Sequence, residues 1–263
     1  MRRKIWIMAV LASMMACLAS EAQFHPTGTL TPDPAPKPSD LTVDQLIAKH
    51  SAARGGDQKL NGIQSVKMTG TWDSNAAGSS PITLMIAPGR FMRRIAQGSD
   101  VKMANVVDGQ TQWELNPLGG LKKAAPMPAK SAARYRRLAD PQGPLVNSKA
   151  KGVKVEVVGK LPWQSSQVYK LKVTFGDGAV SYLYLDAKTF LLVRTVTPVY
   201  VPQLNKDVDL ETIYKDFRDV DGVKFPFVEE ASAPETGSKS TTTWKTIEVN
   251  KPLDPAAFKA PAS

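Results

Sequence analysis

The sequence predicts a mainly β (α+β) protein, built on a curled antiparallel sheet of about eleven strands. Segments in which apolar and polar residues alternate recur from residue 65 to residue 249, and short turns rich in Gly, Pro or Asp join them. A twisted sheet of this size must curl, which creates a concave face. Two helical segments, residues 42–63 and 129–139, are available to cover that face.

The chain begins with the three-part pattern of an export signal. Basic residues 2–4 precede the apolar residues 5–18, and small residues then surround a cleavage position after Ala22. We therefore expect residues 1–22 to be a signal peptide that is removed on export. In the alternative, Cys17, the only cysteine, carries a lipid anchor.

Residues 23–41 are rich in proline, which predicts an extended linker outside the core. The remainder, residues 42–263, is expected to form one domain. It opens with a helix that has a capping-box pattern at Thr42 and Gln45 and ends at Gly55-Gly56. A second short helix is expected to begin with Asp57 as its cap.

A five-strand meander is predicted for residues 65–115, with one apolar face throughout. Its last hairpin turns at Asp108-Gly109, because glycine accepts a positive φ without penalty. The large apolar side chains expected on this face are Val66, Met68, Trp72, Leu84, Ile86, Phe91, Met103, Val107, Trp113 and Leu115. Two interpretations stay open: these residues line a cavity for an apolar ligand, or they form an ordinary closed core.

The second half of the chain returns to strands after a loop at residues 116–128 and the helix at 129–139. Hairpin turns are expected at 176–178, 186–188 and 219–222, where Gly and Asp gather. A terminal helical turn at residues 255–258 is expected to cover a sheet edge with Phe258.

The residues do not favour catalysis. The sequence holds two histidines, and His50 lies on an apolar helix face, where a packed core histidine is the commoner role. No metal-ligand spacing and no glycine-rich phosphate loop appear, and the aspartates near 216–221 occur at turns. We therefore expect a protein that is not an enzyme and that has no cofactor and no metal.

The formal net charge of +10 is compatible with acidic partners or membrane head groups, and equally with a solvated basic surface. Basic motifs interleaved with aromatic residues are missing from the sequence, so a nucleic-acid partner is not expected.

Several motifs, taken in order, resemble the periplasmic outer-membrane lipoprotein carriers, the LolA/LolB-like proteins. The motifs are DGQTQW at 108–113 with Asn116-Pro117, YLD at 184–186 with Leu191-Leu192, DFRDVDGVKFPF at 216–227, and NKPLD at 250–254 with Phe258. The resemblance implies an incomplete β-barrel with a helical lid, whose cavity holds acyl chains. It implies a periplasmic, monomeric carrier of lipidated proteins or amphiphilic lipids, with partner proteins in the inner and outer membranes.

One position departs from the carrier pattern. The carriers have an arginine just before the proline of the early turn, and it latches the lid helices. Ala87 stands there, before Pro88, so we expect Ala87→Arg to tighten closure of the lid. The same fold also serves envelope sensors and interaction modules, and this function class stays open as the alternative.

Overall fold

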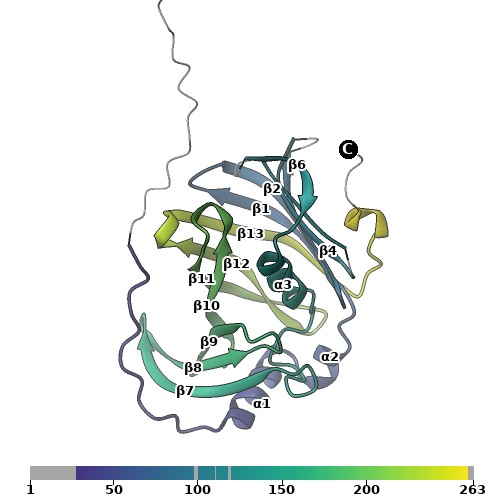
Figure 1. Ribbon diagram of the computed structural model, residues 1–263. Helices are drawn as coiled ribbons and strands as arrows, with labels where there is room; N and C mark the ends of the chain where they lie inside the picture. The colour runs from purple at the N-terminus through teal and green to yellow at the C-terminus, as the bar shows by residue number, and fades with distance from the viewer. Residues whose placement is uncertain (1–27, 98–99, 110, 118–119, 260–263) are drawn as a thin grey trace, which may run out of the picture.

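The computed structural model describes residues 28–97, 100–109, 111–117 and 120–259. Within these ranges the protein is one antiparallel sheet of thirteen strands with few helices (Figure 1). The expected signal peptide at 1–22, Cys17 and the start of the proline-rich stretch lie outside the described residues.

The sheet consists of two meanders joined side by side. The first contains β1 (Val66–Ser74), β2 (Gly78–Ala87), β3 (Arg90–Gln97), β4 (Asp100–Asp108), β5 (Thr111–Asn116) and β6 (Leu121–Pro126). The second contains β7 (Lys154–Trp163), β8 (Ser166–Thr174), β9 (Val180–Asp186), β10 (Leu192–Val201), β11 (Lys206–Val220), β12 (Val223–Ala233) and β13 (Ser238–Val249). Strands β1 and β13 pair with each other, so β6 and β7 are the two edges of an unclosed, curled sheet.

The helical segments are short. They are α1 (Val43–Arg54), α2 (Asp57–Asn61), α3 (Ala129–Leu138) and the 3-10 turns η2 (Pro202–Leu204), η3 (Pro234–Thr236) and η4 (Pro255–Phe258). The predicted capping box is present, since the backbone amide and side chain of Thr42 both bond with Gln45. Asp57 is not the cap of α2, because Gly56 holds that position without a side-chain bond and Asp57 is the first helical residue.

The predicted curled sheet is confirmed, and it has thirteen strands where about eleven were expected; β6 is one strand that was not predicted. This strand lies inside the segment 116–128 that was expected to be loop, and it pairs with β5. Two lysines and Pro126 weaken its strand pattern, and they are residues that proteins place on exposed sheet edges.

The predicted helix at 129–139 lies against the concave face as α3. Figure 1 shows α3 in the opening between the two halves of the sheet, where it contacts β3, β4 and β10. Tyr135 anchors it, with its ring centroid 5.2 Å from that of Phe91. Helix α3 therefore spans the trough that the curled sheet forms.

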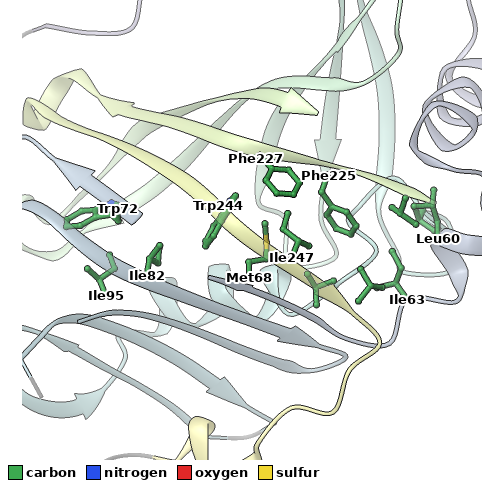
Figure 2. Packing of buried hydrophobic residues seen from close by; sticks show 14 residues of the cluster. Leu60, Ile63, Met68, Trp72, Ile82, Ile95, Phe225, Phe227, Trp244 and Ile247 are labelled. Atoms are coloured by element: carbon green, nitrogen blue, oxygen red, sulfur yellow. The ribbon is translucent and has the colours of Figure 1, made fainter. Parts of the chain in front are cut away.

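The concave face carries the largest core. Side chains from β1, β2, β3, β12 and β13 form one layer with Leu60 of α2 and nearby Ile63. Figure 2 shows this layer as a continuous row, from Trp72 and Ile95 at one end to Leu60 and Ile63 at the other. In the second half, Leu46 of α1 packs on strands β8 and β9, so α1 and α2 close one end of the trough.

The described part of the proline-rich segment expected at residues 23–41 is extended and has no buried residue, and it is bonded to the sheet. Asp33 accepts bonds from Arg194 (2.7 Å), Lys170 (2.6 Å) and the Tyr184 hydroxyl (2.6 Å) on the outer face of the sheet. Lys37 pairs with Lys160 on the β7 edge. Proline keeps this segment extended, and an extended segment can also pack along a strand.

Candidate functional site

The concave trough contains two adjoining hollows of about 340 Å³ and 460 Å³. Seven residues line both, namely Trp72, Arg93, Arg134, Tyr135, Leu210, Ala231 and Ser240. Ligand sites typically measure about 300–1,000 Å³, so each hollow is large enough for part of a small amphiphile. The trough is therefore the candidate site.

The hollow nearer α2 is largely apolar. Val66, Met68, Leu84, Ile86 and Phe91 line it from β1, β2 and β3. Alternation places these side chains on one face of their strands, and the pairings of Met68 with Leu84 and of Ile86 with Phe91 bring the strands into register. Leu84 and Ile86 are only half-buried, so apolar surface remains accessible inside the trough.

The polar hollow lies beyond it, toward β5 and η2. A single row across the sheet shows the transition, because Leu84 is opposite Arg93, Arg93 is opposite Asn105, and Asn105 is opposite Glu114. Directly opposed residues lie on the same face. The row therefore passes from apolar to charged side chains within three strands.

Burial dominates the electrostatics of the charged residues here. It lowers the pKa of Arg93, whose charge also interacts with Tyr135, Arg134 and Glu229. It raises the pKa of Glu229, although a 2.9 Å bond from Trp244 Nε1 and the charge of Arg93 act in the opposite direction. Burial also raises the pKa of Glu114. Both carboxyl groups are thus biased toward the neutral form.

Eight of the ten sequence-predicted site residues lie on the concave face. Six of them line the apolar hollow, namely Val66, Met68, Trp72, Leu84, Ile86 and Phe91. Met103 lines the polar hollow, and Val107 packs beneath α3 with Phe91 and Tyr135. Their role in binding a ligand stays a prediction.

Trp113 and Leu115 lie on the opposite face, so the expectation that they share one surface with Leu84 and Met103 is wrong. Trp113 pairs with Val106, and both belong to an outer cluster with Met92 and Phe258. The alternation along β5 was assigned correctly. The register of the hairpin turns the Trp113 side of β5 outward and places Gln112 and Glu114 inward.

The position of Ala87 also contradicts the expectation that an arginine there would tighten closure of the lid. Ala87 follows Ile86 and pairs with Arg90, so its side chain is on the outer face, near Phe258. An arginine at this position would point away from α3, and a tighter lid no longer follows from Ala87→Arg. The turn meets α3 through its backbone instead, because the amide of Gly89 donates a 3.1 Å bond to the carbonyl of Ala139.

Several polar residues of the trough were missed from the sequence. Arg93, Asn105, Arg134 and Glu229 are not among the site residues predicted from the sequence. A signal existed for Arg93, because a charged residue between Phe91 and Ile95 on an inward-facing strand is unusual.

In contrast, His50 is a buried core residue as predicted, and its Nδ1 lies 2.9 Å from the carbonyl of Phe190.

Among the described residues, no group of His, Cys, Asp or Glu side chains has an arrangement that could hold a metal ion. No helix in the described part of the chain is long and apolar enough to cross a membrane.

Comparison with solved structures identifies the fold. The chain is similar to a DUF1329 family protein from Desulfovibrio piger, at 12% identity and a TM-score of 0.55 over 83% of this chain and 97% of that one. It is similar to a LolA superfamily protein from Nitrosomonas europaea, at 12% identity and a TM-score of 0.53 over 83% and 98%. It is also similar to a putative outer membrane lipoprotein-sorting protein domain from Vibrio parahaemolyticus, at 12% identity and a TM-score of 0.52 over 82% and 95%.

The protein therefore has the LolA-like fold, as the sequence motifs indicated. No family model matches the sequence, and no curated protein matches it either.

Proposed function

We propose that this protein is a non-enzymatic periplasmic carrier, which binds the acyl chains of lipidated proteins or other amphiphilic lipids in its concave trough. The observation that carries this proposal is the apolar hollow of about 340 Å³ beneath α3, lined by large side chains from three adjacent strands. The similarity to a lipoprotein-sorting domain supports the same class of cargo.

Acyl burial supplies sufficient free energy for such a role. Each methylene removed from water contributes roughly 0.8 kcal/mol, and about 25 cal/mol is gained per Å² of apolar surface. A chain of about a dozen methylenes therefore gains several kcal/mol, even after the cost of ordering the ligand. The flexible side chain of Met68 suits chains of different length and saturation.

A pair of matched substitutions tests the proposal. Leu84→Glu places a carboxylate in the apolar hollow, where an entering chain would have to desolvate it. Leu115→Glu makes the same change at a half-buried leucine on the outer face. With a fluorescent fatty acid as probe, we expect Leu84→Glu to abolish binding and Leu115→Glu to leave it unchanged, provided that thermal melting shows both variants folded.

The outcomes separate the function classes. Unchanged probe binding by folded Leu84→Glu protein would contradict the cavity assignment. Failure of the wild-type protein to bind any acyl probe, or to carry lipid after detergent-free purification, would favour a sensor or interaction module.

Export is the second part of the proposal. Residues 1–22 would direct the chain to the periplasm, and the mature protein would begin at Gln23. N-terminal sequencing of protein from the periplasmic fraction tests this, and a lipid-modified Cys17 at the N-terminus would show a membrane anchor instead.

A further inference from the structure

Two guanidinium groups meet at the border between the apolar and the polar hollow. Arg93 reaches it from β3, and Arg134 reaches it from α3 on the opposite wall. Both residues line both hollows, so any molecule that extends from one hollow into the other passes them. The helix and the sheet thus each contribute one cation to the same point of the trough.

Neither cation forms an ion pair within the described chain. Arg134 lies over the ring of Tyr135, with its guanidinium carbon 5.0 Å from the centroid, and neither arginine forms an ion pair or hydrogen bond with a described residue. Guanidinium groups stay protonated at neutral pH, and a desolvated charge without a partner destabilises a protein. A bound anion would remove this cost.

A third polar group next to them also lacks a partner. Asn105 faces Arg93 from the neighbouring strand and is only 5% exposed. Its Oδ1 atom makes no hydrogen bond with any described residue. Buried amide groups are nearly always hydrogen-bonded, so an unpaired acceptor inside a cavity indicates a donor that a ligand or water supplies.

We propose that Arg93 and Arg134 bind the anionic head group of an acyl amphiphile, with a hydroxyl or water beside that head donating a hydrogen bond to Asn105 Oδ1. This inference rests on the proposed function, because the chain of the same ligand occupies the apolar hollow. Carboxylate and phosphate heads share the chemistry that two guanidinium groups recognise, and such charge-assisted bonds are the strongest available to a side chain. The ligand class is therefore a fatty acid or an anionic phospholipid, and a neutral acylglycerol is excluded.

Two carboxyl groups also face this region. One oxygen of Glu229 already accepts the bond from Trp244, and Glu114 lies beyond Asn105 at the far end of the row. Neither is within ion-pair distance of Arg93 or Arg134 in the described chain. The two arginines therefore remain available to a ligand.

The experiment compares two ligands that differ only in the head. A pyrene-labelled long-chain fatty acid and its methyl ester are titrated into the full-length mature protein. We expect the acid to bind about tenfold tighter than the ester or more, because hydrogen bonds between charged groups are lost with the ester. In Arg93→Met and Arg134→Gln the two ligands should bind alike, at the affinity of the ester.

Matched controls come from the neighbouring arginines. Arg94, the next residue on β3, has its side chain on the outer face, and Arg136 on α3 bonds to Gln112 outside the shared border. Arg94→Gln and Arg136→Gln should keep the preference for the acid. Thermal melting of Arg93→Met should be unchanged or raised, because an unpaired charge is removed.

Each outcome is decisive. Equal binding of acid and ester by the wild-type protein overturns the head-group site and leaves acyl binding intact, whereas no binding of either overturns the proposed function as well. Displacement of the acid by inorganic phosphate at equal concentration would show a simple anion site and would also overturn the inference. Native mass spectrometry after incubation with phosphatidylglycerol vesicles, with and without the fatty acid, shows which anionic head is retained.

Discussion

The indole Nε1 of Trp113 donates a 3.1 Å hydrogen bond to the backbone carbonyl of Phe258. Trp113 lies in the middle of β5 and Phe258 at the end of η4, so the bond fastens the C-terminal turn to the outer face of the sheet. Phe258 is 1% exposed and packs beside Met85 and Met92. The outer face of β3–β5 is therefore a second core, separate from the trough.

Phe258→Ala should destabilise the protein without affecting acyl binding. Removal of a fully buried phenylalanine ring costs about 3–5 kcal/mol, since a cavity remains beneath the turn. Urea unfolding measures the loss, and a fluorescent fatty acid measures binding by the remaining folded protein. Weaker acyl binding at unchanged stability would place Phe258 in the ligand site and contradict the two-core arrangement.

The position of Trp113 shows what the sequence could predict and what it could not. Alternation along β4 and β5 assigns side chains to faces within each strand, and it did so correctly for Trp113 and Gln112. The hairpin register decides which face of β4 and which face of β5 form one surface. In this register Val106 is opposite Trp113. Both faces of β4 carry buried valines, Val106 outward and Val107 inward, so hydrophobicity alone did not distinguish them.

A bulge in β4 is a second feature that makes the face of a side chain hard to predict from the sequence. Met103 pairs with Ile95, but the next pair is Val101 with Ala96, so Lys102 is the extra residue. The extra residue moves Val101 to the outer cluster, although its odd number suggests the face of Met103. The curled sheet and α3 were predictable from local patterns, whereas bulges and packing partners depend on distant strands.

Asp33→Asn should detach the N-terminal segment from the sheet. Burial alone would raise the pKa of Asp33, but bonds from Arg194, Lys170 and Tyr184 outweigh burial and lower it. Loss of the charge should cost roughly 1.5–3 kcal/mol, because hydrogen bonds to charged groups have that value and Glu211 still pairs with Arg194 at 2.6 Å.

Limited proteolysis measures this detachment directly. Residues 28–41 should be cleaved faster in Asp33→Asn than in wild type, and the control Asp209→Asn, at an exposed site on β11, should behave as wild type. Because the folded pKa of Asp33 is lowered, its contribution is complete above its ordinary pKa and is lost as the pH falls below it. An equal cleavage rate in both variants would show that Asp33 does not hold the segment.

His50 should make the protein sensitive to mild acid. Burial lowers the pKa of His50 to about 4, with a smaller effect from Arg54, although the carbonyl of Phe190 acts in the opposite direction. The unfolded chain binds a proton near the ordinary value of 6.5. The stabilising contribution is therefore complete above 6.5 and is lost as the pH falls toward about 4, which amounts to about 3 kcal/mol.

Urea unfolding at several pH values tests this, with His50→Gln as the comparison. Glutamine keeps a donor for the Phe190 carbonyl and has no titratable group in this range. The variant should therefore lose less stability than the wild type between neutral pH and about pH 5. Parallel curves for the two proteins would assign the acid sensitivity to other groups.

Glu229 should control how anion binding depends on pH. Burial raises its pKa above 4.5, against the Trp244 bond and the Arg93 charge. Ionised Glu229 would repel an anionic head beside Arg93, and protonation of Glu229 as the pH falls removes that repulsion. An alkyl sulfonate probe, which stays ionised throughout, should therefore bind more tightly at low pH. At a pH where the wild-type carboxyl is ionised, Glu229→Gln should bind it more tightly than wild type, by about 1 kcal/mol or about fivefold in Kd.

The pH dependence of anion binding can be assigned to Glu229, because the other ionisable groups of the trough are accounted for. Burial raises the pKa of Tyr214 to about 12, so its hydroxyl does not titrate in the acid range, and guanidinium groups in general stay protonated there. Glu114 also has a raised pKa, and the pH dependence that survives in Glu229→Gln measures its share. Glutamine still accepts the hydrogen bond from Trp244 and keeps the wall in place. Unchanged affinity together with an unchanged pH profile in this variant would show that the head group does not lie near Glu229, and the assignment of the Arg93 end of the trough to anion binding would then fail.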